Sequence, residues 1–219
     1  MGAKKVVAVS PYFYYARQEK KIGTCEFVPV ELIAKILEFS GIDCLITIDW
    51  HSPKIENFFN IQTINLDTAE LFAQTLTNKE NSIIVSPDNG SAIRAQNISN
   101  LLKIDTCIMH KTRINNDCIM KIITGNVASK NCVIVDDIID TGSTLCNAAE
   151  LLINAGALSV EAIVTHAILS GNAIEKIQKS QIKKITITNS ISHQQLPNIF
   201  KIIDITHTLK GGIAYILKA

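Results

Sequence analysis

The chain has 219 residues and a mass of 24.0 kDa, a length that fits one domain or two small ones. Apolar residues make up 47% and charged residues 19%, which excludes a disordered chain. The net charge of +1 argues against a protein that binds nucleic acid through bulk charge. No apolar run approaches the roughly 18 residues of a membrane span, and the first residues lack a signal-peptide core. We therefore expect a cytoplasmic protein that does not contact a membrane.

Short apolar runs alternate with amphipathic segments along the chain. The runs are continuous, as expected for strands that are covered on both faces. They are Val6–Val9, Leu45–Ile48, Ile83–Val85, Cys107–Met109, Cys132–Val135, Ala162–Val164 and Ile185–Ile187. The segments with helical spacing are Pro29–Ser40, Thr68–Leu76, Ala92–Lys103, Ser143–Ala155, Asn172–Ser180 and a final one over Thr208–Leu217. This alternation predicts the α/β fold class with a mainly parallel sheet.

The six cysteines have neither the CxxC spacing nor the wider spacing of a zinc site. Cys107 and Cys132 lie inside apolar runs. We therefore expect reduced, buried cysteines that act as small hydrophobic residues.

The segment VIVDDIIDTGST, residues 133–144, is the strongest functional signal. An apolar strand leads into Asp136 and Asp137, and a hydroxyl-rich turn with Gly142 follows before a helix opens. In open α/β sheets, ligands bind beyond the carboxyl ends of the strands, and the first turn of a helix attracts phosphate. The carboxylates beside such a turn suit the vicinal hydroxyls of a sugar. A simple helix cap is the alternative, although a cap requires only one Asp or Ser.

The same segment resembles the phosphoribosyl-diphosphate loop of the type I phosphoribosyltransferases, and other segments resemble one branch, the ribose-phosphate pyrophosphokinases. YFYYARQEKK at 12–21 is similar to that family's PYFGYARQDRK, and DWH with FF at 49–59 is similar to DLH with GFF. VSPDNG at 85–90, followed by RA, resembles VSPDxGGxxRA, and KTR at 111–113 resembles KRR. The resemblance runs in order over nearly the whole chain, which makes the set specific.

The resemblance implies diphosphoryl transfer, in which the 1-hydroxyl of ribose 5-phosphate attacks the β-phosphorus of Mg-ATP and AMP leaves. It assigns Asp136 and Asp137 to the ribose. It also implies that Lys111 and Arg113 stabilise the transition state from a mobile loop. The residues that would hold the 5-phosphate are Asp140, Thr141, Gly142, Ser143 and Thr144.

The resemblance also implies a nucleotide site, in which Arg17, Gln18 and His51 bind ATP, while His51 and Asp88 position Mg²⁺ with the triphosphate. A histidine like His51, taken alone, is more often a core or surface residue than a ligand, and Asp88 could be a turn former. Magnesium prefers oxygen ligands, so we expect His51 to act through water or on phosphate. The chain's three arginines, Arg17, Arg94 and Arg113, all lie in the resembling segments, where a planar donor fork suits phosphate. A structural ion pair is the alternative for Arg94.

The family has a longer region before the segment that matches Val6, so the resemblance implies a truncated first domain. We expect a remnant of the first phosphoribosyltransferase-like domain over 1–68, a second such domain with the ribose-phosphate loop over 69–205, and a terminal helix over 206–219 that packs on the first. Ser91 also stands where the family has a second glycine. Truncation would expose apolar sheet surface, which predicts a homo-oligomer or a partner chain.

Three functions remain open. A base phosphoribosyltransferase would use the same loop but would have no need for Arg17, Gln18 or His51. A non-catalytic, truncated relative would bind ribose 5-phosphate or a full-length synthetase. The matches outside the loop favour a ribose-phosphate diphosphokinase of nucleotide biosynthesis, with ATP and ribose 5-phosphate as substrates and Mg²⁺ as cofactor.

Overall fold

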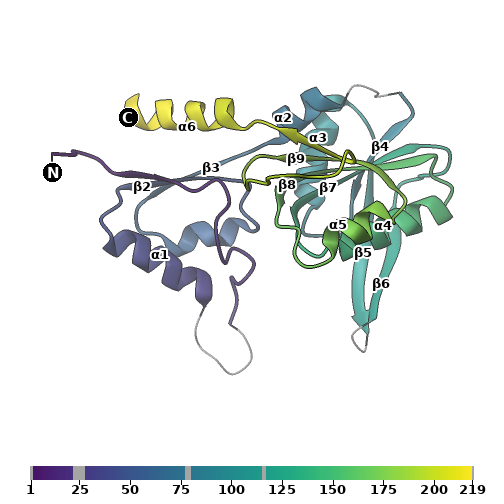
Figure 1. Ribbon diagram of the computed structural model, residues 1–219, viewed down its shortest axis with the longest axis horizontal. Coiled ribbons are helices and arrows are strands. Elements are labelled where there is room, and N and C mark those ends of the chain that lie inside the picture. The colour runs from purple at the N-terminus through teal and green to yellow at the C-terminus, as the bar shows by residue number, and fades with distance from the viewer. Residues whose placement is uncertain (1, 22–27, 77–79, 115–116, 219) are drawn as a thin grey trace. The chain divides into compact units, whose positions relative to one another are not determined.

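The computed structural model describes residues 2–21, 28–76, 80–114 and 117–218, except that the side chains of 111–114, 117–120 and 123 are not described. The chain forms two compact units, one of Met1–Thr68 with Asp204–Ala219 and the other of Ala69–Ile203 (Figure 1). Each unit has its own sheet of mainly parallel strands, which confirms the predicted α/β class. None of the described helices is long and apolar enough to cross a bilayer.

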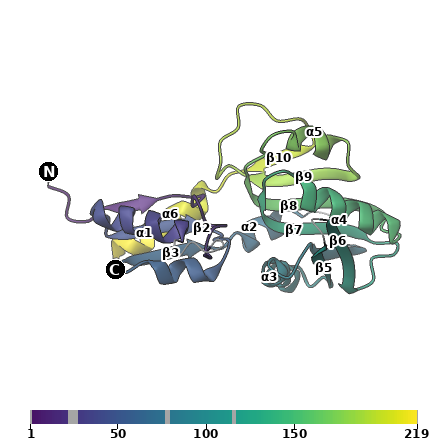
Figure 2. The ribbon, with the colours of Figure 1, turned by 90° about the horizontal axis from the view of Figure 1, so that it is seen from below.

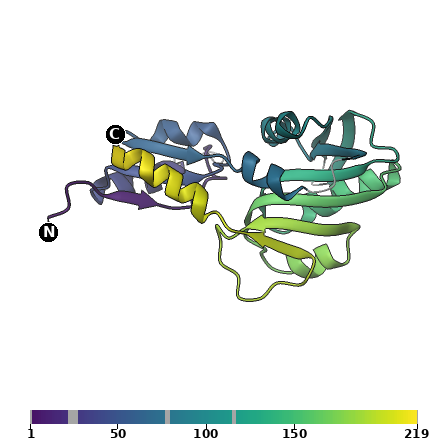
Figure 3. The ribbon, with the colours of Figure 1, turned by 90° about the horizontal axis from the view of Figure 1, so that it is seen from above.

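The first unit is a three-stranded parallel sheet in the order β1-β2-β3. Its elements are β1 (Val7–Val9), α1 (Pro29–Phe39), β2 (Cys44–Ile48), the 3-10 helix η1 (Pro53–Phe58), β3 (Gln62–Leu66) and α6 (Thr206–Lys218). Successive residues of β2 pack on opposite faces of this sheet. Leu45 joins a cluster with Val30 of α1, whereas Ile46 packs with Ile216 of α6. Helix α6 therefore covers one face of the small sheet (Figure 3).

The second unit has a seven-stranded sheet in the order β10-β9-β8-β7-β4-β5-β6. All neighbouring strands are parallel except β5 and β6, which form an antiparallel pair. Its strands are β4 (Ser82–Ser86), β5 (Thr106–Ile114), β6 (Asp117–Thr124), β7 (Asn131–Ile139), β8 (Ser159–Ala167), β9 (Ile182–Thr188) and β10 (Phe200–Ile203). Its helices are α2 (Ala69–Thr75), α3 (Ala92–Leu102), α4 (Ser143–Asn154) and α5 (Ala173–Gln178).

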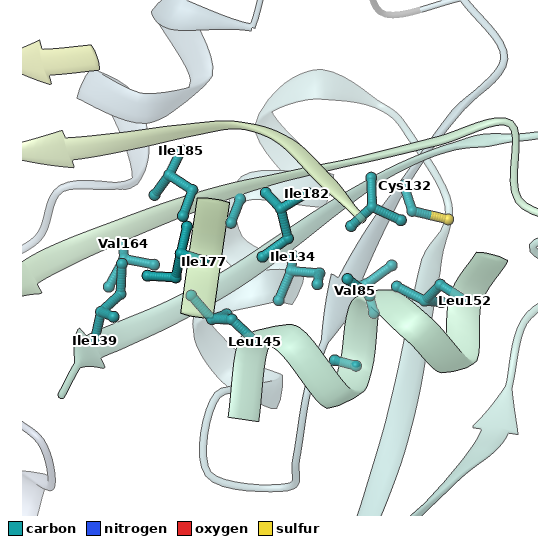
Figure 4. Packing of buried hydrophobic residues seen from close by; sticks show 14 of the residues in the cluster. Val85, Cys132, Ile134, Ile139, Leu145, Leu152, Val164, Ile177, Ile182 and Ile185 are labelled. Atoms are coloured by element: carbon teal, nitrogen blue, oxygen red, sulfur yellow. The ribbon is translucent and has the colours of Figure 1, made fainter. Parts of the chain in front are cut away.

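The central strand β7 is buried on both faces, which explains its continuous apolar run. Cys132 and Ile134 pack with Leu145 and Leu152 of α4, as Figure 4 shows. Val133 and Val135 belong to a separate cluster on the other face, with residues of α2 and α3. Helices α4 and α5 thus cover one face of the sheet, and α2 with α3 covers the other (Figure 2).

Each apolar run predicted as a strand overlaps one, and each predicted helical segment overlaps a helix. Three strands, β3, β6 and β10, were not predicted. All three are edge strands of their sheets. An edge strand is less covered than a central one, so it needs no continuous apolar run: β10, for example, buries only its two end residues.

The described cysteine side chains follow the prediction. Cys44, Cys107, Cys132 and Cys146 form no disulfide, and the first three are buried. Burial raises the pKa of the Cys107 thiol to about 11 and that of Cys132 to about 12, so these thiols are chemically inert at neutral pH. Cys25 and the side chain of Cys118 lie outside the described residues.

Candidate functional site

The turn between β7 and α4 is the geometric centre of the candidate site. Residues 140–142 connect the carboxyl end of β7 to the first turn of α4, and Gly142 is the residue that caps the helix. Gly142 has a φ of 74°, and a Cβ there would lie 3.1 Å from the side chain of Ile177. Only glycine fits this position without strain. The chain therefore places a glycine turn at a helix N-terminus, where phosphate binds favourably.

The side chains of this turn remain accessible. Thr141 is exposed, while Asp140, Ser143 and Thr144 are half-buried. The hydroxyls of Thr141 and Ser143 lie 3.1 Å apart. The five residues predicted to hold a phosphate thus form one continuous segment with hydroxyls and backbone amides at the edge of the sheet.

The structure corrects the sequence prediction of where strand β7 ends. The strand does not end at the two carboxylates but continues to Ile139, so Asp136 and Asp137 lie inside β7. Both side chains are buried, at 8% and 6% exposure. Adjacent positions of a strand point to opposite faces, which is consistent with different roles for the two residues.

Asp136 is held by a network of polar contacts. The Ser91 hydroxyl donates to its Oδ1 at 2.7 Å, and the Asp137 backbone N–H donates to the same oxygen at 3.0 Å. Burial, followed by the neighbouring Asp137 charge, raises the pKa of Asp136 to about 8 despite the Ser91 hydrogen bond, and Asp88 adds to the rise. Burial and the neighbouring charge therefore favour the protonated form of the Asp136 carboxyl more than in an ordinary aspartate.

Asp88 lies in the turn that follows the adjacent strand β4. Its Oδ1 accepts hydrogen bonds from the backbone N–H groups of Gly90 at 2.9 Å and Ser91 at 3.2 Å. The turn thereby brings Ser91 to Asp136, and the charges of Asp88 and Asp137 both act on the Asp136 carboxyl. Strands β4 and β7 are parallel neighbours, which explains why their carboxyl ends meet.

Lys176 is a site residue that the sequence did not indicate. Its Nζ donates to the Ser143 hydroxyl at 2.9 Å, so an ammonium group of α5 adjoins the turn. No motif surrounds this lysine in the sequence, and it lies 33 positions from Ser143. Ser91 was noted only as a departure from the family pattern, and its contact with Asp136 likewise appears only in the fold.

The ends of β8 and β9 border the same edge of the sheet. The His166 Nδ1 lies 2.8 Å from the Ser190 hydroxyl, and the Thr188 hydroxyl donates to the Thr165 carbonyl at 2.6 Å. These hydrogen bonds lock the two strand ends together. The Ser170 N–H donates to the Asp140 carbonyl at 3.0 Å, which ties the β8 end to the turn.

The residues predicted to bind ATP, Arg17, Gln18 and His51, belong to the first unit, and all three side chains are exposed. Arg17 and Gln18 end a turn that is anchored by Phe13 and Ala16, each 3% exposed. The Gln18 N–H donates to the Tyr15 carbonyl at 2.8 Å. The first unit therefore presents these side chains on a packed support.

Lys111 and Arg113 lie in the paired strand β5 rather than in the mobile loop that the sequence suggested. Their backbones pair with Met120 and Cys118 of β6. Thr106–Ile114 and Asp117–Thr124 are long enough to form a two-stranded antiparallel ribbon, which explains the strand conformation. The side chains of Lys111 and Arg113 lie outside the description, so their roles remain predictions.

Asp88 and His51 were predicted to position magnesium, and they belong to different units. Asp88 retains one carboxylate oxygen, Oδ2, that accepts no hydrogen bond from the described residues, and carboxylate oxygen suits this hard cation. No three described His, Cys, Asp or Glu side chains form a group that could enclose a metal. Among the described residues, Asp88 could therefore offer one carboxylate oxygen to a magnesium ion.

Comparisons with protein families agree with this geometry. The family described as phosphoribosyl transferase domain matches residues 54–199, which include the turn, Asp88, Asp136 and Asp137. The family described as the N-terminal domain of ribose phosphate pyrophosphokinase matches residues 1–41. Together the two matches cover most of both units.

Similar proteins of known sequence are named ribose-phosphate pyrophosphokinase. The chain is 40% identical to a ribose-phosphate pyrophosphokinase of Agrobacterium fabrum over 87% of its own length and 63% of that protein. It is 41% identical to ribose-phosphate pyrophosphokinase A of Dictyostelium discoideum, over 97% of this chain and 69% of the relative. The crystal structure of phosphoribosylpyrophosphate synthetase from Mycobacterium smegmatis superposes with a TM-score of 0.90 at 27% identity, over 99% of this chain and 72% of that one. The chain therefore belongs to the ribose-phosphate pyrophosphokinase family.

Proposed function

We propose that this chain is a ribose-phosphate diphosphokinase that makes phosphoribosyl diphosphate from Mg-ATP and ribose 5-phosphate. The 1-hydroxyl oxygen forms a bond to the β-phosphorus, the bond from that phosphorus to the α,β-bridging oxygen breaks, and AMP leaves with that oxygen while the hydroxyl proton is released. The observation that carries the proposal is the glycine turn between β7 and α4, next to Asp136 and Asp137. The relatives named ribose-phosphate pyrophosphokinase support it.

In this proposal, ribose 5-phosphate is held by its phosphate at residues 140–144. Hydroxyls and the α4 N-terminus are suitable donors to phosphate oxygens. The Lys176 ammonium at Ser143 adds a positive charge beside the anion. Asp136 and Asp137 are assigned to the ribose hydroxyls. Because burial and the Asp137 charge favour the protonated form of Asp136, the pair presents less negative charge to the phosphate than two ordinary carboxylates would.

The nucleotide side of the reaction is assigned to Arg17, Gln18 and His51 of the first unit. Lys111 and Arg113 are assigned to the charge that develops in the transition state. Magnesium, which would be held by Asp88 together with the triphosphate, neutralises phosphate charge when it is bound. We assign the unit of Met1–Thr68 and Asp204–Ala219 to the family's amino-terminal domain, since the amino-terminal family match over 1–41 lies within it.

The direct experiment incubates the purified chain with Mg-ATP and ribose 5-phosphate, separates AMP by chromatography and identifies phosphoribosyl diphosphate by phosphorus NMR. We expect AMP to form only when both substrates are present. Lys111→Ala should abolish AMP release while ribose 5-phosphate binding remains, whereas Lys121→Ala, at an exposed lysine of the same hairpin, should retain activity. The absence of AMP release by the unmodified chain, under conditions where it is folded, would contradict the proposal.

A further inference from the structure

Asp49 has a positive φ, which is uncommon for an aspartate, and it lies close to His51 in the chain. It follows the last residue of β2 and precedes His51 by two positions, and its φ is 44°. This left-handed region is uncommon for residues other than glycine, although Asn and Asp enter it more readily than most. A strained backbone persists only where its surroundings hold it, and such positions cluster at ligand and active sites. The contacts of Asp49 therefore need explanation.

Two residues of β3, Asn65 and Leu66, and Thr68, two positions after that strand, hold the Asp49 turn. The Asp49 N–H donates to the Leu66 carbonyl at 2.9 Å, and the Thr68 hydroxyl donates to the Asp49 Oδ2. The next N–H, that of Trp50, donates to the Asn65 Oδ1 at 3.0 Å. Asp49 and Thr68 are 5% and 1% exposed. The carboxylate is thus engaged inside the unit and is not presented to a ligand.

Trp50 is fixed by packing rather than by its polar atom. Its ring stacks on Phe59 with centroids 6.0 Å apart and lies 6.3 Å from Phe13. The side chain is 6% exposed, and its buried indole N–H has no hydrogen-bond acceptor among the described residues. His51, the next residue, is exposed. Two buried residues held from several sides therefore lead directly to one exposed imidazole.

We propose that Asp49 is a positioning residue, which, anchored by Thr68, fixes the turn that presents His51 to the triphosphate of ATP. The inference rests on the proposed function, because it takes ATP as the ligand of His51. Asp49 contributes through the backbone and not by contact with the nucleotide. A residue that served only the stability of the first unit would not affect the handling of one substrate selectively.

Asp49 has two relevant properties, a backbone that adopts a positive φ and a carboxylate that accepts the Thr68 hydrogen bond. Three substitutions separate their effects. Asp49→Asn retains an acceptor for Thr68 and tolerates a positive φ. Asp49→Gly accepts the positive φ but loses the acceptor, and Asp49→Ala loses both. The matched control is Asn81→Ala in the second unit, where Asn81 has a φ of 55° and a side-chain hydrogen bond to the Ser129 carbonyl. This control loses the tolerance of a positive φ and a side-chain hydrogen bond, here one that Asn81 donates, at a position in the other unit.

Two measurements report the result. Steady-state kinetics give KM separately for ATP and for ribose 5-phosphate. Titration with Mg-ATP is also followed by tryptophan fluorescence, which comes from Trp50 alone because the chain has a single tryptophan. We expect Asp49→Ala to raise KM for ATP about tenfold, with KM for ribose 5-phosphate within about twofold of the original value. Asp49→Asn should restore the ATP value, Asp49→Gly should lie between them, and Asn81→Ala should change neither.

A second pair of variants covers the case in which Asp49→Ala does not fold. Thr68→Val removes the hydroxyl that binds Asp49 and preserves the shape of the side chain, whereas Thr68→Ser retains a hydroxyl. Thr68→Val should raise KM for ATP by a smaller factor than Asp49→Ala, and Thr68→Ser should remain near the original value.

The possible results test the positioning role of Asp49 separately from the proposed diphosphokinase activity. Equal KM for ATP in Asp49→Ala and the unmodified chain, or an equal rise for both substrates, would overturn the positioning role and leave the function intact. A weaker fluorescence response to Mg-ATP in Asp49→Ala, restored in Asp49→Asn, supports the inference even if AMP is never released. An unmodified chain that does not bind Mg-ATP would overturn both.

Discussion

Asp136 shows how a single residue acquires its chemistry from the fold. An ordinary aspartate is ionised at neutral pH, but here burial and the Asp137 charge favour the protonated form, while the Ser91 hydroxyl favours the ionised form. Ser91 stands where the family pattern that the sequence resembles has a second glycine, which could not supply this hydroxyl. Residue 91 therefore influences the protonation of Asp136.

The raised pKa of Asp136 predicts a pH dependence of stability. Above about pH 4 the folded chain retains the Asp136 proton to higher pH than the unfolded chain does, so the free energy of unfolding falls as pH rises through this range. Asp136→Asn cannot lose a proton and should be increasingly more stable than the original chain as pH rises through this range. Urea unfolding at several pH values measures the difference, and a constant difference would refute the predicted titration.

For single residues, the sequence indicated Asp136 and Asp137 as candidate site residues because they lie side by side in a motif. It did not indicate the contact of Ser91 with Asp136, which joins residues 45 positions apart, or that of Lys176 with Ser143. Such contacts depend on the order of strands and helices in space, which local patterns do not encode. A motif therefore identifies the residues that touch a ligand more readily than those that surround them.

At the scale of elements, the turn between β7 and α4 depends on Gly142. An alanine there combines a left-handed backbone with a Cβ that lies 3.1 Å from Ile177. We predict that Gly142→Ala lowers the free energy of unfolding by about 1–3 kcal/mol and removes the thermal stabilisation by ribose 5-phosphate. The second effect follows because the turn must move to relieve the contact.

The control for this variant is Gly41→Ala. Gly41 has a φ of 83°, and a Cβ there would meet nothing within 4 Å, so this variant carries the backbone strain without the contact. It should lose stability yet retain the response to ribose 5-phosphate, as thermal unfolding with and without the sugar phosphate would show. A Gly142→Ala variant that responds like the original chain would remove the turn from the site.

All central strands were predictable from the sequence, and the three strands that were missed, β3, β6 and β10, are edge strands. Strand β7 is covered on both faces, so its apolar run is continuous and its place is evident. Strand β3, with alternating partly exposed residues, has no such run, and the strand conformation at Lys111 was likewise missed. The sequence predicted that β7 ends before Asp136, because two adjacent aspartates are typical of a strand end. Their burial, which extends the strand to Ile139, is visible only in the structure.

At the scale of the whole molecule, we propose that the chain self-associates through α1. Leu32, Ile36 and Phe39 follow one another at helical spacing and are 44%, 50% and 96% exposed. Exposed apolar patches on soluble proteins commonly mark interfaces. We predict that Phe39→Glu weakens self-association at least about tenfold without unfolding the chain. Sedimentation over a range of concentrations tests this, and a chain that is monomeric at all of them would refute it.

The central claim is that a sugar phosphate binds where β7 meets α4. The most direct measurement is calorimetric titration of the purified chain with ribose 5-phosphate, alongside Asp140→Ala and the control Asp105→Ala, whose exposed side chain pairs with Lys130. We expect saturable binding at one site per chain, its loss in Asp140→Ala and its retention in Asp105→Ala. Equal binding by Asp140→Ala, or no binding by the folded, unmodified chain, would contradict it.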